Sequence, residues 1–255
     1  MVFDEYAEYY DLLYKDKDYV GEANYIDSII KKYGTNIKTI LELGCGTGKH
    51  AELLSEKGYI IHGVDMSAGM LIKANERAVD NPKISFSRAN IQKFNLEEKY
   101  DAVTAWFHVM SYQNTDNELL MVIKNVYKHL KNGGIFVFDS WYGPAVLLQR
   151  PELRVKRFEN DRIHITRIAE PMLRENENIV EVNYDVFISN KATGEIKEIK
   201  ETHKMRYLFT NEVKKLAEKV GFEYVSDFEF MTDMPLSKET WGSCFVLKKV
   251  DGVIL

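Results

Sequence analysis

The feature that most constrains this chain is a glycine-rich turn, Glu42-Leu43-Gly44-Cys45-Gly46-Thr47-Gly48. It lies between an apolar run, Thr39-Ile40-Leu41, and a helical pattern over 48–57. Glycine at alternate positions permits positive φ and lets the backbone approach a ligand with no Cβ in the way. The next apolar run ends in Asp65, and a carboxylate at a strand end can accept hydrogen bonds from ribose hydroxyls. The sequence therefore predicts a site for a nucleoside-containing cofactor.

The spacing of the glycines indicates which cofactor this site binds. Dinucleotide sites follow G-x-G-x-x-G, but here the third glycine comes one residue early, at Gly48, and Lys49 occupies the dinucleotide position. The pattern E-x-G-x-G-x-G resembles motif I of class I S-adenosylmethionine-dependent methyltransferases. The resemblance covers roughly 36–145 strongly and the whole chain loosely. It implies a Rossmann-like α/β fold with a seven-stranded sheet, S-adenosylmethionine as cofactor, and a methyltransferase activity.

The same resemblance implies roles for individual residues. Glu42 would orient motif I and the amino-acid end of the cofactor, and Gly44, Gly46 and Gly48 would line it. Asp65 would bind the ribose. Further cofactor contacts are implied at Met66 (packing on adenine), at Asn90 and Ile91 after the third strand, and at Trp106 beside the methyl donor. Asn90 departs from the acidic residue that many members have there, although its carbonyl can still accept a hydrogen bond from the adenine amine.

Hydrophobic periodicity predicts an alternation of strands and helices, which is typical of a parallel sheet covered on both faces. Residues 4–33 have helical spacing throughout. The expected strands of the core are 39–43, 60–64, 84–88, 100–106 and 134–140, and the expected helices are 48–57, 68–78 and 116–130.

The pattern changes after residue 150. Residues 153–209 show polar–apolar alternation with turn-like breaks, which predicts three or four antiparallel strands. A helix over 211–220 and strands near 224–231 and 241–249 complete the core. We therefore expect a core formed by 1–150 and 210–255, with an N-terminal helical cap over about 1–35, and an inserted antiparallel subdomain over 151–209 that covers the substrate.

Within the superfamily, the chain is most similar to small-molecule methyltransferases, including N-methyltransferases of nucleotide-linked amino sugars. The similarity rests on Tyr10-Asp11 together with Tyr14, on residues 17–19 and on residues 140–144. Candidate proton acceptors are Tyr14, His108 and Tyr112, and candidate substrate-binding residues are Tyr10, Trp141 and Tyr142. For each of these the alternative is ordinary packing. We expect His203, Arg206 and Tyr207 to belong to a solvated strand face, and Arg157 and Arg167 to be surface arginines unless they meet a phosphate.

Composition narrows the function further. The net charge of −5, from 34 basic and 39 acidic residues, disfavours a nucleic-acid partner. No His, Cys, Asp or Glu cluster has metal-ligand spacing, so we expect no metal. No apolar run approaches a membrane span and no signal peptide is visible, so we expect a cytoplasmic protein, monomeric or homodimeric, with a small-molecule substrate. The alternatives are a nucleic-acid or protein methyltransferase, a non-catalytic S-adenosylmethionine-binding protein and, disfavoured by the glycine spacing, a nicotinamide dehydrogenase.

Overall fold

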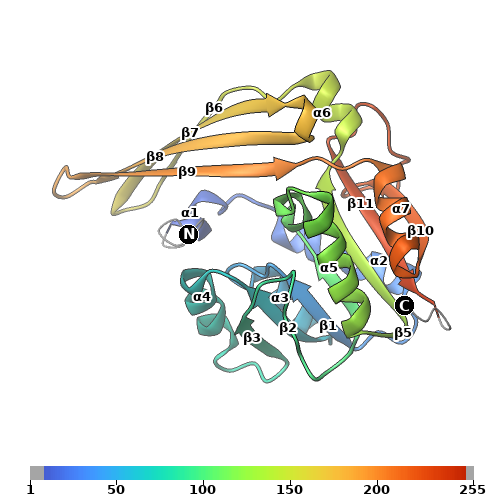
Figure 1. The fold of residues 1–255 in the computed structure, drawn as a ribbon. Coiled ribbons are helices and arrows are strands. Elements are labelled where there is room, and N and C mark those ends of the chain that lie inside the picture. The colour runs from blue at the N-terminus through green and yellow to red at the C-terminus, as the bar shows by residue number, and fades with distance from the viewer. Residues whose placement is uncertain (1–8, 251–255) are drawn as a thin grey trace.

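The computed structural model describes residues 9–250, which form a seven-stranded sheet flanked by helices and a separate four-stranded sheet above it (Figure 1). The strands of the large sheet are β1 (Thr39–Leu43), β2 (Ile60–Asp65), β3 (Ile84–Arg88), β4 (Tyr100–Ala105), β5 (Leu130–Trp141), β10 (Phe222–Glu229) and β11 (Gly242–Lys249). The small sheet contains β6 (Arg154–Glu159), β7 (Ile163–Arg174), β8 (Ile179–Asn190) and β9 (Ile196–Arg206). The α-helices are α1 (Tyr10–Leu13), α2 (Tyr19–Tyr33), α3 (Lys49–Glu56), α4 (Ala68–Ala78), α5 (Asp116–His129), α6 (Gly143–Gln149) and α7 (Thr210–Val220).

The strand order of the large sheet is β3-β2-β1-β4-β5-β11-β10. The strands β1 to β5 pair in parallel, whereas β11 is antiparallel to both β5 and β10. From β1 the chain adds β2 and β3 on one side of the sheet and then crosses to add β4 on the other side of β1. The strand order therefore reverses at β1. The carboxyl ends of β1 and β4 therefore flank a topological switch point, where ligands bind in open α/β sheets.

Two helical layers bury the two faces of this sheet. On one face, α5 and α7 pack on the apolar side chains of β4, β5 and β11, with Leu119, Val126 and Val213 fully buried. On the other, α2 and α3 bury Ile26 and Leu54 against the same strands and β1. The alternation predicted from the sequence thus produces a sheet covered on both sides.

Local signals in the sequence set the ends of the helices. Thr115 and Glu118 form a reciprocal capping box at the start of α5, and Ser67 accepts a hydrogen bond from the backbone amide of Met70 at the start of α4. Gly221 ends α7 in a left-handed conformation with φ of +95°. These caps explain why the predicted helical bounds agree with the structure to within about two residues, as such boundaries usually do.

The small sheet is inserted between β5 and α7 and extends across the carboxyl edge of the large sheet (Figure 1). Its strands pair antiparallel in sequence order, as their alternation predicts. Arg206, at the end of β9, is only 4% exposed and forms ion pairs with Asp116 of α5 and Glu212 of α7. The expectation of a solvated face at this position is wrong, because these two carboxylates hold the guanidinium in the junction between the sheet and the core.

Two other sequence predictions differ from the structure. The helix expected over 4–33 is divided within the described residues into α1 and α2, because Asp18 accepts a hydrogen bond from the amide of Gly21 and starts a new helix; residues 4–8 lie outside the described range. The seven-residue helix α6, which follows Tyr142 with Pro144 in its first turn, was not predicted. Within residues 9–250 no helix combines the length and apolar character that crossing a bilayer requires.

Candidate functional site

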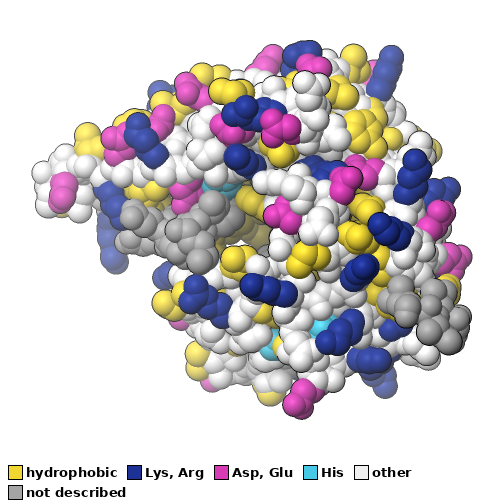
Figure 2. Space-filling model, viewed as in Figure 1, with side chains coloured by type: hydrophobic (Ala, Val, Ile, Leu, Met, Phe, Trp, Pro, Cys, Tyr) yellow, Lys and Arg dark blue, Asp and Glu magenta, His cyan; other side chains and the backbone are white. Residues whose placement is uncertain are grey.

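A cavity of about 760 Å³ lies at the carboxyl edge of the large sheet, beneath the small sheet. Figure 2 shows a hollow in the surface between these two parts of the molecule. Residues at or just after the carboxyl ends of β1, β2, β3, β4 and β5 line the cavity, together with residues of β6, β8 and β9 and of the N-terminal segment. Of the residues predicted to form the site, it is lined by Tyr10, Tyr14, Gly44, Gly46, Asp65, Met66, Asn90, Ile91, Trp106, His108, Tyr112 and Trp141. Glu42, Gly48 and Tyr142 are not part of this lining.

The three glycines of the turn after β1 all have positive φ, but their surroundings differ. A Cβ on Gly44 would lie 2.5 Å from Val109, and one on Gly48 would lie 2.6 Å from Phe86. A Cβ on Gly46 would meet no atom of the described residues within 4 Å other than its chain neighbours, and the residue lines the cavity. Gly44 and Gly48 therefore allow close packing of the protein on itself, whereas Gly46 leaves open space on the cavity side.

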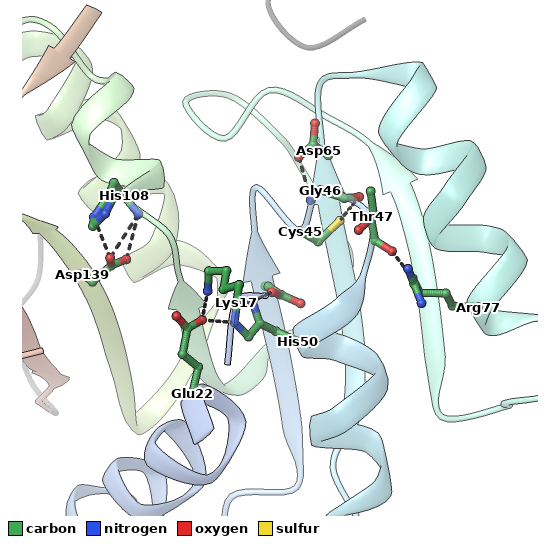
Figure 3. Close-up of polar contacts among 11 residues, drawn as sticks. Lys17, Glu22, Cys45, Gly46, Thr47, His50, Asp65, Arg77, His108 and Asp139 are labelled. Atoms are coloured by element: carbon green, nitrogen blue, oxygen red, sulfur yellow. Dashed lines mark hydrogen bonds and ion pairs between the residues drawn. The ribbon is translucent and has the colours of Figure 1, made fainter. Parts of the chain in front are cut away.

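Asp65 is the last residue of β2 and lies beside this turn (Figure 3). Its Oδ2 accepts a hydrogen bond from the amide of Gly46 at 2.9 Å, and its Oδ1 accepts one from the amide of Ser67 at 2.8 Å. An ionised carboxylate has about four lone-pair directions, so this anchored group can still accept hydrogen bonds from a ligand. The backbone contacts fix the carboxylate at the cavity wall before any ligand arrives.

The turn is supported from behind by a chain of largely buried titratable groups. Glu42 is 2% exposed, and among the described residues its Oε2 has no hydrogen-bond partner. Burial, reinforced by the nearby charge of Asp65, raises the pKa of Glu42 to about 8. Its Oε1 lies 3.8 Å from Nδ1 of His50, whose Nε2 lies 2.7 Å from Glu22, which in turn pairs with Lys17 (Figure 3). Glu42 is therefore protonated at neutral pH.

His108 follows β4 and has an unusual left-handed backbone, with φ of +64°. Its amide donates to both carboxylate oxygens of Asp139, at 3.0 and 3.2 Å, and its ring Nδ1 lies 2.8 Å from Oδ2 without hydrogen-bond geometry (Figure 3). Asp139 is fully buried near the end of β5. Asp139 was not singled out from the sequence, although its place at a strand end was a usable signal.

Aromatic side chains form much of the remaining wall. Tyr14 packs edge-on against Phe107, with ring centroids 5.0 Å apart, and its hydroxyl accepts a hydrogen bond from Arg167 at 3.2 Å. The indole of Trp141 packs at 5.7 Å against that of Trp241, which also lines the cavity. Aromatic faces attract cations, so such a wall suits a positively charged ligand group.

The small sheet contributes a polar cluster to the same wall. The hydroxyl of Tyr112 lies 2.8 Å from Nδ1 of His203, and Nε2 of His203 lies 2.9 Å from a carboxylate oxygen of Glu201. His203 is 4% exposed and lines the cavity, and Tyr207 is fully buried. The prediction of a solvated strand face is wrong here as well, because the sheet lies over the core and buries the side of β9 that carries His203.

Comparison with known proteins identifies a methyltransferase domain. Residues 40–134 match the model of a methyltransferase domain. The chain is 25% identical to the dTDP-3-amino-3,4,6-trideoxy-α-D-glucopyranose N,N-dimethyltransferase of Streptomyces venezuelae over 76% of this chain and 81% of that protein. It is 29% identical to the dTDP-3-amino-3,6-dideoxy-α-D-glucopyranose N,N-dimethyltransferase of Streptomyces fradiae over 55% of this chain and 54% of that protein. Its fold is similar, with a TM-score of 0.82 and 21% identity, to an S-adenosylmethionine-dependent methyltransferase from Clostridium acetobutylicum, over 98% of this chain and 100% of the other.

The chain carries a methyltransferase domain and is an S-adenosylmethionine-dependent methyltransferase. The strand order with its antiparallel β11 and the glycine turn after β1 agree with that assignment.

The cavity of this methyltransferase fits the cofactor on its own geometry. The open space on the cavity side of Gly46 leaves room for a ligand, and the fixed carboxylate of Asp65 is placed to accept hydrogen bonds from hydroxyls. Met66, 45% exposed, and Asn90 lie beyond Asp65 on the same wall. The Oδ1 of Asn90 already accepts the amide of Gln92 at 2.8 Å, so a ligand would use its second lone pair or its amide group.

Proposed function

We propose that this enzyme transfers a methyl group from S-adenosylmethionine to the amino nitrogen of a nucleotide-linked sugar. The observation that carries the proposal is the similarity to two N,N-dimethyltransferases of dTDP-linked amino sugars, one of which is matched over 81% of its length. A match of that extent reaches beyond the cofactor-binding half of the fold. The small sheet over the cavity supports the proposal, because it provides a second wall against which an acceptor can be held.

In this proposal, Gly44, Gly46 and Asp65 hold the cofactor, with Met66, Asn90, Ile91 and Trp106 around its base and methyl-bearing ends. When bound, S-adenosylmethionine supplies an activated methyl carbon. The residues of the chain then have to bring a nucleophile close to that carbon and in line with the bond that breaks, which accounts for much of the rate enhancement in such displacements.

Charge on the cavity side of the small sheet supports a phosphate-containing acceptor. Arg154 of β6 lines the cavity, and Lys156 lies two residues further along the same face of that strand. Lys156 pairs in register with Arg167 of β7, which is 7% exposed and whose guanidinium lies over the ring of Tyr184. Arginine and lysine side chains are the usual ligands of phosphate oxygens, so this face suits the diphosphate of a nucleotide sugar.

Tyr10, Trp141 and the neighbouring Tyr142 are proposed to contact the sugar, and Tyr14, His108 and Tyr112 are the candidate proton acceptors. A small-molecule acceptor also fits the acidic net charge of −5, which does not favour a nucleic acid. A cytoplasmic location and a monomeric or homodimeric state complete the proposal.

The test is a methyl-transfer assay with the purified enzyme and a panel of acceptors. The panel contains dTDP-linked amino sugars, the same sugars without the nucleotide, dTDP-linked sugars with a hydroxyl in place of the amine, and a small DNA duplex. Mass spectrometry should detect methylation of the nucleotide-linked amine first. Methylation of the hydroxyl analogues or the duplex, with the amine unchanged, would refute the proposed acceptor. Cofactor binding without turnover on any member of the panel would favour a non-catalytic binding protein.

A further inference from the structure

A second cavity, of about 460 Å³, adjoins the main one. Its walls are formed by the end of α1 and the loop after it, by Phe107, and by three consecutive residues of β6, Lys156, Arg157 and Phe158. Tyr14 and Phe107 line both cavities, and their rings pack edge to face with centroids 5.0 Å apart. The two cavities are therefore neighbours that share this aromatic pair as part of their walls.

The size of the main cavity limits how much of the proposed acceptor it can hold. Pockets of roughly 300–1,000 Å³ usually bury one drug-sized ligand. The main cavity has about 760 Å³ and must hold both the cofactor and the acceptor amine during the transfer. A nucleotide-linked sugar is itself a ligand of drug size, and its base is many bonds away from the amine. The nucleotide end therefore needs space beyond that which the two reacting groups occupy.

Positive charge gathers at the second cavity. Its lining has three cationic side chains, Lys17, Lys156 and Arg157, against one acidic side chain, Asp16. Lys17 is already neutralised, because it forms an ion pair with Glu22. Within residues 9–250 the other two cations have no ion pair, although the protein as a whole has a net charge of −5. Such a local excess of positive charge attracts an anion, and lysine and arginine are the usual ligands of phosphate oxygens.

The position of β6 explains how two adjacent cations reach one cavity. Successive side chains of a strand point to opposite faces, so Lys156 and Phe158 share the face that packs toward the core and Arg157 lies on the other. Because β6 is the edge strand of the small sheet, a space that borders its free edge can be lined from both faces. The second cavity therefore borders this edge, where side chains can approach a ligand from two sides.

Aromatic rings lie beside these cations. Phe158 is half-buried, and the guanidinium of Arg167 lies 5.8 Å from the centroid of its ring. The Nζ atom of Lys17 lies 4.6 Å from the centroid of Phe107. Nucleobases stack on aromatic side chains irrespective of which base they are, since every base has a π-face. The second cavity thus combines ligands for phosphate with aromatic surface, which are the two kinds of contact that a nucleotide needs.

We infer that the second cavity binds the nucleoside diphosphate of the acceptor, while the sugar reaches past Tyr14 and Phe107 into the main cavity. This inference rests on the proposed nucleotide-linked acceptor. Lys156 and Arg157 contact the diphosphate, and Phe158 stacks on the base. Contacts made by this distant part of the substrate hold the amine in position for the transfer. They also distinguish a nucleotide-linked sugar from the free sugar.

The first test measures binding without turnover. dTDP is titrated by calorimetry into the protein saturated with S-adenosylhomocysteine, which fills the cofactor site. We expect the wild type to bind dTDP and the double variant Lys156→Gln/Arg157→Gln to bind it at least about 10-fold more weakly, because charge-assisted hydrogen bonds are lost. Phe158→Leu keeps an apolar side chain but loses stacking, so its Kd for dTDP should rise roughly 5-fold or more.

The matched control is Arg162→Gln. Arg162 is an equally exposed cation in the turn between β6 and β7, and it lines neither cavity. Its variant should bind dTDP as the wild type does. Added salt should weaken dTDP binding to the wild type and to Arg162→Gln more than to the double variant, because salt screens the charges that the double variant lacks.

The second test is kinetic. dTDP should inhibit methylation competitively against the nucleotide-linked amine, and the double variant should raise the KM for that acceptor at least about 10-fold while its cofactor Kd stays close to wild type. Unchanged dTDP affinity in the double variant or in Phe158→Leu would overturn this placement and leave the proposed function standing, as would a wild type that methylates the acceptor without binding dTDP. Absence of methylation of every nucleotide-linked amine would refute the proposed function itself.

Discussion

Gly46 offers the most direct test of the cofactor site, because its missing side chain opens onto the cavity. Gly46→Ala adds a Cβ that, apart from the chain neighbours of residue 46, meets no atom of residues 9–250 within 4 Å, so we expect its effect on folding to come from the backbone. At φ of +54° an L-residue costs about 1–2 kcal/mol relative to glycine. Gly133→Ala is matched to it, since Gly133 has φ of +73°, equally open surroundings and no contact with the cavity.

Both variants should therefore lose about 1–2 kcal/mol of unfolding free energy, measured by urea denaturation without ligand. Only Gly46→Ala should also lose cofactor affinity. If the alanine side chain enters space that the cofactor fills, the overpacking should cost about 1–3 kcal/mol of binding free energy. This corresponds to a roughly 5- to 150-fold higher Kd of the cofactor. Isothermal titration with S-adenosylmethionine and S-adenosylhomocysteine measures this directly. Equal affinities of Gly46→Ala and Gly133→Ala would refute the placement of the cofactor against this turn.

Three further predictions concern the same cavity. Asp65→Ala should weaken cofactor binding by about 1–3 kcal/mol in calorimetry, because hydrogen bonds to a charged acceptor are lost, and unchanged affinity in a folded variant would place the ribose elsewhere. The pKa of Glu42 is raised from 4.5 to about 8 in the folded state, so the unfolding free energy should fall as the pH rises between these values, by up to about 1.4 kcal/mol per pH unit; Glu42→Gln should flatten this slope in urea titrations. Tyr14→Phe and His108→Gln should lower kcat more than cofactor affinity if either group contacts the acceptor, and a KM effect alone would assign them to binding.

The core of the fold could be predicted because its signals are local. Each parallel strand of the core is a short apolar run that ends in a turn, and the observed β1 and β3 have the predicted bounds of 39–43 and 84–88. The four antiparallel strands of the small sheet were likewise visible in their alternation. The break between α1 and α2 was missed because helical spacing of apolar residues continues across Asp18, where a side-chain cap decides the outcome.

Burial by a distant segment explains the predictions that failed. His203 and Arg206 lie on a strand whose sequence alternates like that of a half-exposed sheet. Whether a face of this strand meets solvent or protein depends on where the small sheet lies relative to the core. That placement is a property of the tertiary structure and has no local signal in the sequence. The same holds for Asp139, whose significance comes from its contact with the left-handed backbone of His108 in the segment that follows the neighbouring strand β4.

The two halves of the cavity therefore differ in how they are encoded. The proposed cofactor half is centred on one turn and the strand end beside it, and these central residues, from Gly44 to Asp65, lie within about two dozen positions of sequence. The acceptor half is assembled from the N-terminal segment, the turn after β4 and three strands of the small sheet. The short helix α1 joins the halves, since Asp11 accepts a hydrogen bond from Thr47 of the glycine turn while Leu13 packs on Ile165 of the small sheet. A motif can reveal the first half, whereas the second exists only after these separate segments have packed together, which is why the sequence predicted the cofactor more sharply than the acceptor.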